Sequence, residues 1–102
     1  MRVVRVGELP DGALEAAAEF YARVLPLLSP PRAGEDLAVI FWPAPYDHRA
    51  WRLAAIQDLA RAAAPVRVNG IVGHDERSIA ETLVWLEAAP GVTGQLLAVE
   101  PG

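Results

Sequence analysis

Three side chains that can move protons or stabilise charge stand almost side by side: Tyr46, His48 and Arg49. A phenol, an imidazole and a guanidinium in close proximity can serve as an acid, a base and a stabiliser of negative charge. The same residue types are also typical of a helix start at the surface, with a polar cap and a partly exposed tyrosine. Both interpretations stay open, and the surface interpretation is the more common for such clusters.

A second polar pair, His74 and Asp75, follows a β-prone segment further along the chain. In a parallel sheet this pair lies at the same edge as Tyr46, and parallel α/β sheets bind ligands beyond the carboxyl ends of their strands. The two histidines and Asp75 have no recognised metal-site spacing, so no metal is predicted. The residues expected to line a shallow pocket are Gly7, Pro43, Tyr46, His48, Arg49, Gly73 and His74.

The elements that position these residues alternate between strand and helix patterns. Strands are predicted at residues 3–6, 37–42, 66–72 and 95–99, and helices at residues 11–25, 47–64 and 75–89. The predicted N-caps are Asp11, Asp47 and Asp75, and the polar positions of the second helix are Arg49, Arg52, Asp58 and Arg61. The order predicts a single α/β domain over residues 1–102, with a four-stranded, mainly parallel sheet and three helices.

The crossovers between these strands predict a sheet with one bare face. If the strands are neighbours in chain order, right-handed crossovers place the helices mostly on the same side. A parallel sheet rarely leaves its other face in water, so we expect a second chain to cover it. Hydrophobic residues make up 53% of the sequence and the mean hydropathy is +0.22, which favours subunit contact. An alanine-rich composition without apolar patches explains the same values.

Charge and composition exclude several classes of partner. The net charge is −4 and every basic residue is an ungrouped arginine, which disfavours nucleic acid as a partner. There is no cysteine, so disulfides and thiolate metal sites are excluded. No apolar run has membrane-spanning length and the N-terminus lacks a signal-peptide pattern, so we expect a cytoplasmic protein without membrane contact.

Four stretches of the sequence resemble one enzyme family. They are "YARVLPLL", "DLAVIFW", "LARAAAPVRVNGIVG" and "SIAETLVWLEAAPGVTGQLLAVEPG", which begin at Tyr21, Asp36, Leu59 and Ser78. Together they resemble the C-terminal half of short-chain dehydrogenases/reductases, with the Arg-Val-Asn step before one strand and the Thr-Gly-Gln step before the last. The resemblance implies a partial Rossmann-like fold. It also implies that Asn69 satisfies backbone groups inside the sheet.

The chemistry of that family is not matched. Its Gly-rich cofactor turn has no counterpart, because Gly7 stands alone before Glu8. The family's catalytic tyrosine and lysine align with Pro45 and Arg49, and its serine falls near Pro43. Tyr46 is displaced by one residue, a rotation of about 100° on a helix. The N-terminal cofactor half is expected to be missing, so we predict a protein that binds no cofactor and is not an enzyme.

Large apolar residues suggest where subunits meet. Tryptophans can stack on ligands but are more often core or interface anchors. Trp85 lies in the last helix, which takes part in subunit association in the resembled family. The predicted interface residues are Phe20, Tyr21, Trp51, Trp85 and Leu96.

Three functions follow, in order of preference. The first is a non-catalytic structural or regulatory subunit that forms a homo-oligomer (a dimer or tetramer) or pairs with a full-length dehydrogenase. The second is a small-molecule binding module that uses the pocket at the strand ends. The third is a minimal oxidoreductase that uses Tyr46, His48 or His74.

Overall fold

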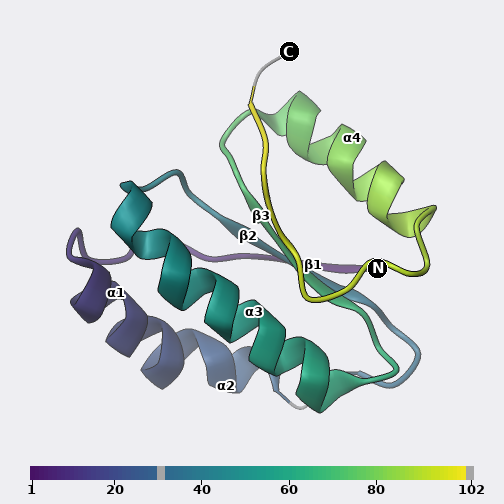
Figure 1. Cartoon of the computed structure of the whole chain (residues 1–102), viewed down its shortest axis with the longest axis horizontal. Coiled ribbons are helices and arrows are strands. Elements are labelled where there is room, and N and C mark those ends of the chain that lie inside the picture. Colours follow the sequence, from purple (N-terminus) through teal and green to yellow (C-terminus); the bar gives the residue numbers. More distant parts are fainter. Residues whose placement is uncertain (30–31, 101–102) are drawn as a thin grey trace.

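The computed structural model describes residues 1–29 and 32–100. Four parallel strands form one sheet in the order β1-β2-β3-β4, with helices on both faces (Figure 1). The elements are β1 (Arg2–Arg5), α1 (Ala13–Glu19), the π-helix η1 (Phe20–Val24), α2 (Leu25–Leu28), β2 (Leu37–Phe41), the 3₁₀ turn η2 (Tyr46–His48), α3 (Arg49–Ala63), β3 (Val68–Val72), α4 (Glu76–Glu87) and β4 (Leu96–Ala98). This architecture confirms the predicted α/β class with a four-stranded parallel sheet.

The two central strands separate two hydrophobic cores. Every residue of β2 is buried, because its side chains alternate between the two faces and both faces are covered. Val39 and Phe41 belong to the larger core, under the helical segment from α1 to α2 and under α3. Ile40 and Ile71 belong to the smaller core, under α4. The continuous apolar run at residues 37–41 therefore reflects burial on both sides of the sheet.

The position of α4 corrects the expected bare face. Helices α1, α2 and α3 lie on one side of the sheet, and α4 lies on the other (Figure 1). The steps from β2 to β3 and from β3 to β4 go in the same direction, so the crossover through α4 has the opposite hand to the crossover through α3. The prediction of three crossovers of one hand was wrong. The part of this face that α4 leaves open is β1, where Val3 is 41% exposed.

The first helical segment is longer than its sequence pattern predicts. It runs from Ala13 to Leu28 without a break, and its middle turn is a π-helix. Pro26, which was expected to end the helix, sits in its last part, where the wider π turn directly before it accommodates the missing N–H. Asp11 does not cap the helix. The N-cap is Gly12, and it makes no side-chain cap hydrogen bond.

The other two predicted caps have different outcomes. His48, rather than Asp47, is the N-cap of α3, because the η2 turn delays the start of the helix. Asp75 caps α4 as predicted, and its carboxylate accepts hydrogen bonds from the N–H of Ser78 at 2.9 Å and from its hydroxyl at 2.6 Å. Over the described ranges, every helix is too short or too polar to cross a membrane.

Polar contacts close the amino edge of the sheet. Arg67, directly before β3, bonds the carboxylate of Asp36 at 2.7 to 2.9 Å and also donates to two carbonyl oxygens at the end of α4. Asn69 is 3% exposed; its amide nitrogen donates to the Val92 carbonyl oxygen at 3.0 Å, and its side-chain oxygen accepts from the N–H of Gln95 at 3.1 Å. The expected structural role of Asn69 is confirmed.

Candidate functional site

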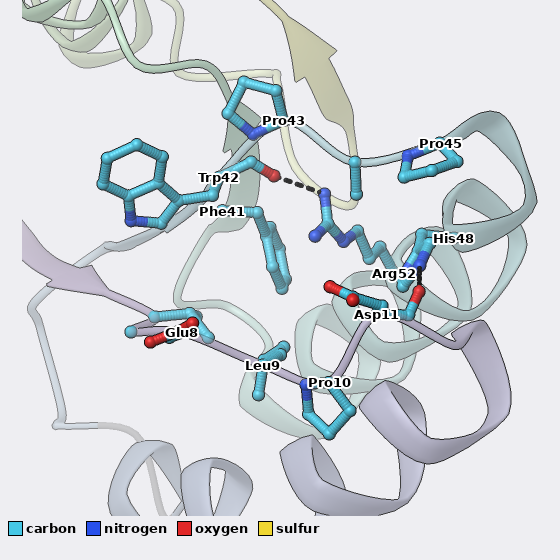
Figure 2. Close-up of a pocket in the computed structure, with 13 residues that line it drawn as sticks. Glu8, Leu9, Pro10, Asp11, Phe41, Trp42, Pro43, Pro45, His48 and Arg52 are labelled. Atoms are coloured by element: carbon cyan, nitrogen blue, oxygen red, sulfur yellow. Dashed lines mark hydrogen bonds between the residues drawn. The ribbon is translucent and has the colours of Figure 1, made fainter.

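A cavity of about 590 Å³ opens at the carboxyl edge of the sheet, between the ends of β1 and β2 (Figure 2). Past the strand end, the N–H of Val6 still donates to the carbonyl oxygen of Ile40 at 2.9 Å. Pro43 and Pro45 have no N–H with which to continue this ladder, so the two following loops separate. The apolar part of the wall consists of Leu9, Pro10, Phe41, Trp42 and Ala44. The volume of the cavity is in the range of small-molecule sites.

Arg52 gives this cavity a buried positive charge. The residue, on α3, is only 6% exposed. Its Nη1 donates to the carbonyl oxygen of Trp42 at 2.8 Å, and its guanidinium carbon lies 4.9 Å from the centre of the Phe41 ring. Its Nε is buried and has no hydrogen-bond partner among the described residues. Burial lowers the pKa of Arg52, but a guanidinium keeps its proton at neutral pH.

Two carboxylates line the same cavity without pairing with that charge. Glu8 and Asp11 lie on the loop after β1, across from Arg52 (Figure 2). In the part of the chain that the structure describes, neither carboxylate comes within salt-bridge distance of the guanidinium. Both residues are exposed and solvated, whereas Arg52 is buried. The cavity thus has a positive interior and a negative rim.

The imidazole of His48 is fully engaged in structural hydrogen bonds. The residue is 3% exposed. Its Nδ1 accepts from the indole N–H of Trp51 at 3.3 Å, so the proton sits on Nε2 and is donated to the Asp11 carbonyl oxygen at 2.8 Å. The bond to Asp11 holds the start of α3 against the loop before α1 (Figure 2). Any acid–base role of His48 requires one of the two bonds to break.

The seven predicted pocket residues do not converge on one cavity. Tyr46 and Arg49 line a smaller cavity of about 160 Å³ near the ends of β3 and β4, and Tyr46 is 86% exposed. His48 lines both cavities. Gly73 is buried, with its N–H donated to the last carbonyl of β2 at 3.1 Å, and His74 is exposed. Neither Gly73 nor His74 lines either cavity.

Two of the three positions at which the resemblance expects catalytic groups, Pro43 and Pro45, line the larger cavity, and so does Gly7. The third, Arg49, lines only the smaller cavity of the two. Within residues 1–29 and 32–100, no three His, Cys, Asp or Glu side chains gather at a distance that could hold a metal ion. The titratable side chains of the larger cavity are Glu8, Asp11, His48 and Arg52.

The predicted interface residues divide between core and surface. Phe20 is 0% exposed and is packed in the larger core, so it cannot contact a partner, which corrects its assignment. Trp51 and Leu96 are partly buried against the same core. Tyr21 and Trp85 are 40% and 54% exposed and remain accessible.

Arg52 is the functional candidate that sequence reasoning assigned to the wrong environment. It was placed among the polar positions of α3, yet it shares a buried face with Ala55, Ile56 and Leu59. The spacing of three, four and seven residues from Arg52 to these positions is the helical period, so an arginine inside the apolar stripe was a signal in the sequence. Arg49 and Arg61, on the same helix, are exposed.

Comparison with known proteins agrees with this fold. The sequence profile of the SDR-like family of short chain dehydrogenase-like proteins matches residues 4–99. The chain therefore belongs to this SDR-like family, and its four parallel strands with helices on both faces form a Rossmann-like partial fold. No curated protein and no solved structure shows significant similarity to the chain.

Proposed function

We propose that this chain is a non-catalytic, small-molecule-binding member of the SDR-like family, which uses the larger cavity at the carboxyl edge of its sheet. The observation that carries the proposal is a cavity of about 590 Å³ with apolar walls and one buried, incompletely bonded cation, Arg52. This combination of apolar surface and few polar groups is typical of ligand pockets. Binding thus takes precedence over assembly, because α4 covers the sheet face that was expected to need a second chain.

The side chains around the cavity support a role without catalysis. His48 already uses both ring nitrogens, and Tyr46 is 86% exposed and lines the smaller cavity. The positions that align with the family's serine and tyrosine hold Pro43 and Pro45, which carry no hydroxyl. A proton-transfer site needs an acid or base within hydrogen-bond reach of the substrate. The exposed Glu8 and Asp11 are the remaining titratable groups at the rim.

Ligand screening with a cavity-filling variant tests this proposal. Small aromatic molecules of neutral, anionic and cationic type are added to the ¹⁵N-labelled protein, and amide shifts are followed at the ends of β1 and β2. We expect at least one compound to shift these amides and raise the unfolding temperature. Gly7→Phe should abolish the response, because a Cβ at Gly7 points into open space beside the cavity and meets no atom within 4 Å.

The matched control is Gly91→Phe. A Cβ at Gly91 also meets no atom within 4 Å, but this residue follows α4 and lines neither cavity. Its response should equal that of the wild type. The proposal is wrong if no compound shifts the cavity amides, or if Gly7→Phe binds as well as Gly91→Phe. Turnover of an alcohol or carbonyl substrate with a nicotinamide cofactor would contradict the non-catalytic part.

A second candidate, an oligomeric subunit, is supported by apolar side chains at the surface of α4. Val84 and Trp85 are 69% and 54% exposed. Exposed aromatic and β-branched side chains in sequence are typical of protein interfaces. A second copy of this chain is the partner we infer. Light scattering at micromolar concentration should show a dimer or tetramer that Trp85→Ala dissociates, and a monomeric wild type would exclude this role.

A further inference from the structure

Resting on the proposed function, we infer that the ligand of the larger cavity is a small monocarboxylate with an apolar body, held by Arg52. The inference names the chemical class of the ligand and the residue that selects it. It depends on the unused hydrogen-bond capacity of one buried guanidinium and on the chemistry of the walls around it.

The donors of Arg52 are only partly used. A guanidinium has five N–H groups in a planar fork that matches the two oxygens of a carboxylate. Among the described residues, Arg52 makes one hydrogen bond, from Nη1 to the Trp42 carbonyl oxygen at 2.8 Å. Within residues 1–29 and 32–100, the buried Nε has no hydrogen-bond partner and Nη2 makes no hydrogen bond. A buried cation with unsatisfied donors contributes little to the stability of the fold and is a good anchor for an anion.

The surroundings hold the guanidinium in place and leave it available. The Phe41 ring lies 4.9 Å from its central carbon and the Trp51 ring 5.6 Å away, so two aromatic rings pack against the guanidinium. Figure 2 shows the guanidinium beside the Phe41 ring and near the loop that carries Pro43, among the residues that line the cavity. The charge is therefore positioned before any ligand arrives.

The rim of the cavity decides between classes of anion. Glu8 and Asp11 bring two negative charges to the cavity, and Arg52 supplies the one buried positive charge. A phosphate carries a second negative charge at neutral pH, which these carboxylates repel. A monocarboxylate is neutralised by a single guanidinium, and the walls formed by Leu9, Pro10 and Phe41 suit an apolar body.

Three probes of the same shape test the inference: benzoate, benzamide and phenyl phosphate. Their affinities are measured by calorimetry and by shifts of the cavity amides in the wild type and in Arg52→Met, Arg52→Lys and Arg61→Met. We expect benzoate to bind at least about tenfold more tightly than the other two probes, since a paired charge contributes more than a neutral hydrogen bond. In Arg52→Met benzoate should fall to the level of benzamide, and Arg52→Lys should retain an intermediate affinity.

Arg61→Met is the matched control, because Arg61 is on the same helix but exposed and paired with Asp58. It should leave all three affinities unchanged. Equal affinity for benzoate and benzamide, or benzoate binding that survives Arg52→Met, overturns the carboxylate inference while the binding function stands. Tighter binding of phenyl phosphate overturns the choice of a monocarboxylate. If none of these probes shifts the cavity amides while another compound of the screen does, the carboxylate inference fails and the proposed binding function stands.

Discussion

The two edges of the sheet use a buried or partly buried arginine in opposite ways. At the amino edge, Arg67 bonds the Asp36 carboxylate and two carbonyl oxygens at the end of α4. At the carboxyl edge, the more deeply buried Arg52 has one carbonyl oxygen and no carboxylate among the described residues. Arg67 is thus a structural residue, whereas Arg52 has N–H donors without partners among the described residues and lies beside a cavity.

This difference shows where the fold has surplus binding capacity. A charge taken out of water is costly unless it is paired and fully hydrogen-bonded. Arg67 meets that condition and therefore connects β2, β3 and α4. Arg52 does not meet this condition, so the free-energy cost of burying its charge is not fully offset. It lies at the edge where parallel α/β sheets bind ligands. Such a mismatch is expected at a site of function rather than in a structural contact.

The largest expected effect is the loss of Arg67. Arg67→Met leaves the Asp36 carboxylate without its cation and two carbonyl oxygens at the end of α4 without a donor. We expect the free energy of unfolding to fall by about 3 kcal/mol, the range found when one partner of a buried pair is removed. Urea titration followed by tryptophan fluorescence measures the change.

Arg61→Met serves as the surface comparison for that variant. Its pair with Asp58 is exposed, and exposed pairs contribute less than about 1 kcal/mol. If Arg67→Met is no more destabilised than Arg61→Met, the amino edge does not depend on its arginine and the comparison between the two edges fails.

A smaller effect is expected from the acid titration of Asp36. The backbone N–H of Arg67, followed by its side chain, holds the pKa of Asp36 below its ordinary value of 3.8. A lowered pKa contributes stability above the unfolded-state value, and this contribution is lost as the pH falls through the lower folded-state value. At about pH 7, Asp36→Asn should be less stable than the wild type by roughly 1–2 kcal/mol, and the gap should shrink as the pH falls below the ordinary value of 3.8. A gap that stays constant over this range would contradict the lowered pKa.

The smallest expected effect is the loss of Arg52. Arg52→Met removes a buried charge that has few partners and replaces it with an apolar chain of similar length. The free energy of unfolding should stay within about 1 kcal/mol of the wild type, or rise, as it does when uncompensated buried charges are replaced. A loss as large as that of Arg67→Met would make Arg52 a structural residue and would weaken the proposed site. Chemical denaturation under the conditions used for Arg67→Met gives the direct comparison.

The sequence predicted the elements better than their arrangement. The apolar run of β2 and the Asp75 cap of α4 follow from local patterns, and the structural role of Asn69 follows from the family resemblance; the structure confirms all three. The side of the sheet on which α4 lies was predicted wrongly. The hand of that crossover is decided by packing between segments far apart in the chain, and no local pattern encodes it.

The sequence predicted a pocket at the edge where the larger cavity lies, and three of the predicted residues, Gly7, Pro43 and His48, line that cavity. Tyr46, Arg49 and His74 have the chemistry of a site in the sequence, yet the fold directs them to a smaller cavity or to solvent. Arg52 was counted with the solvated arginines. Its burial, at 6% exposure, depends on how α3 packs in the folded chain.

By itself, the sequence determined the alternation of strands and helices, the parallel sheet and the likeness to short-chain dehydrogenases, because periodicity and short motifs are local properties. Only the tertiary structure decided which face of the sheet α4 covers and which arginine side chain is buried away from solvent. Both depend on contacts between segments distant in sequence, and burial turns the same guanidinium from a solvated surface group into an anchor for an anion.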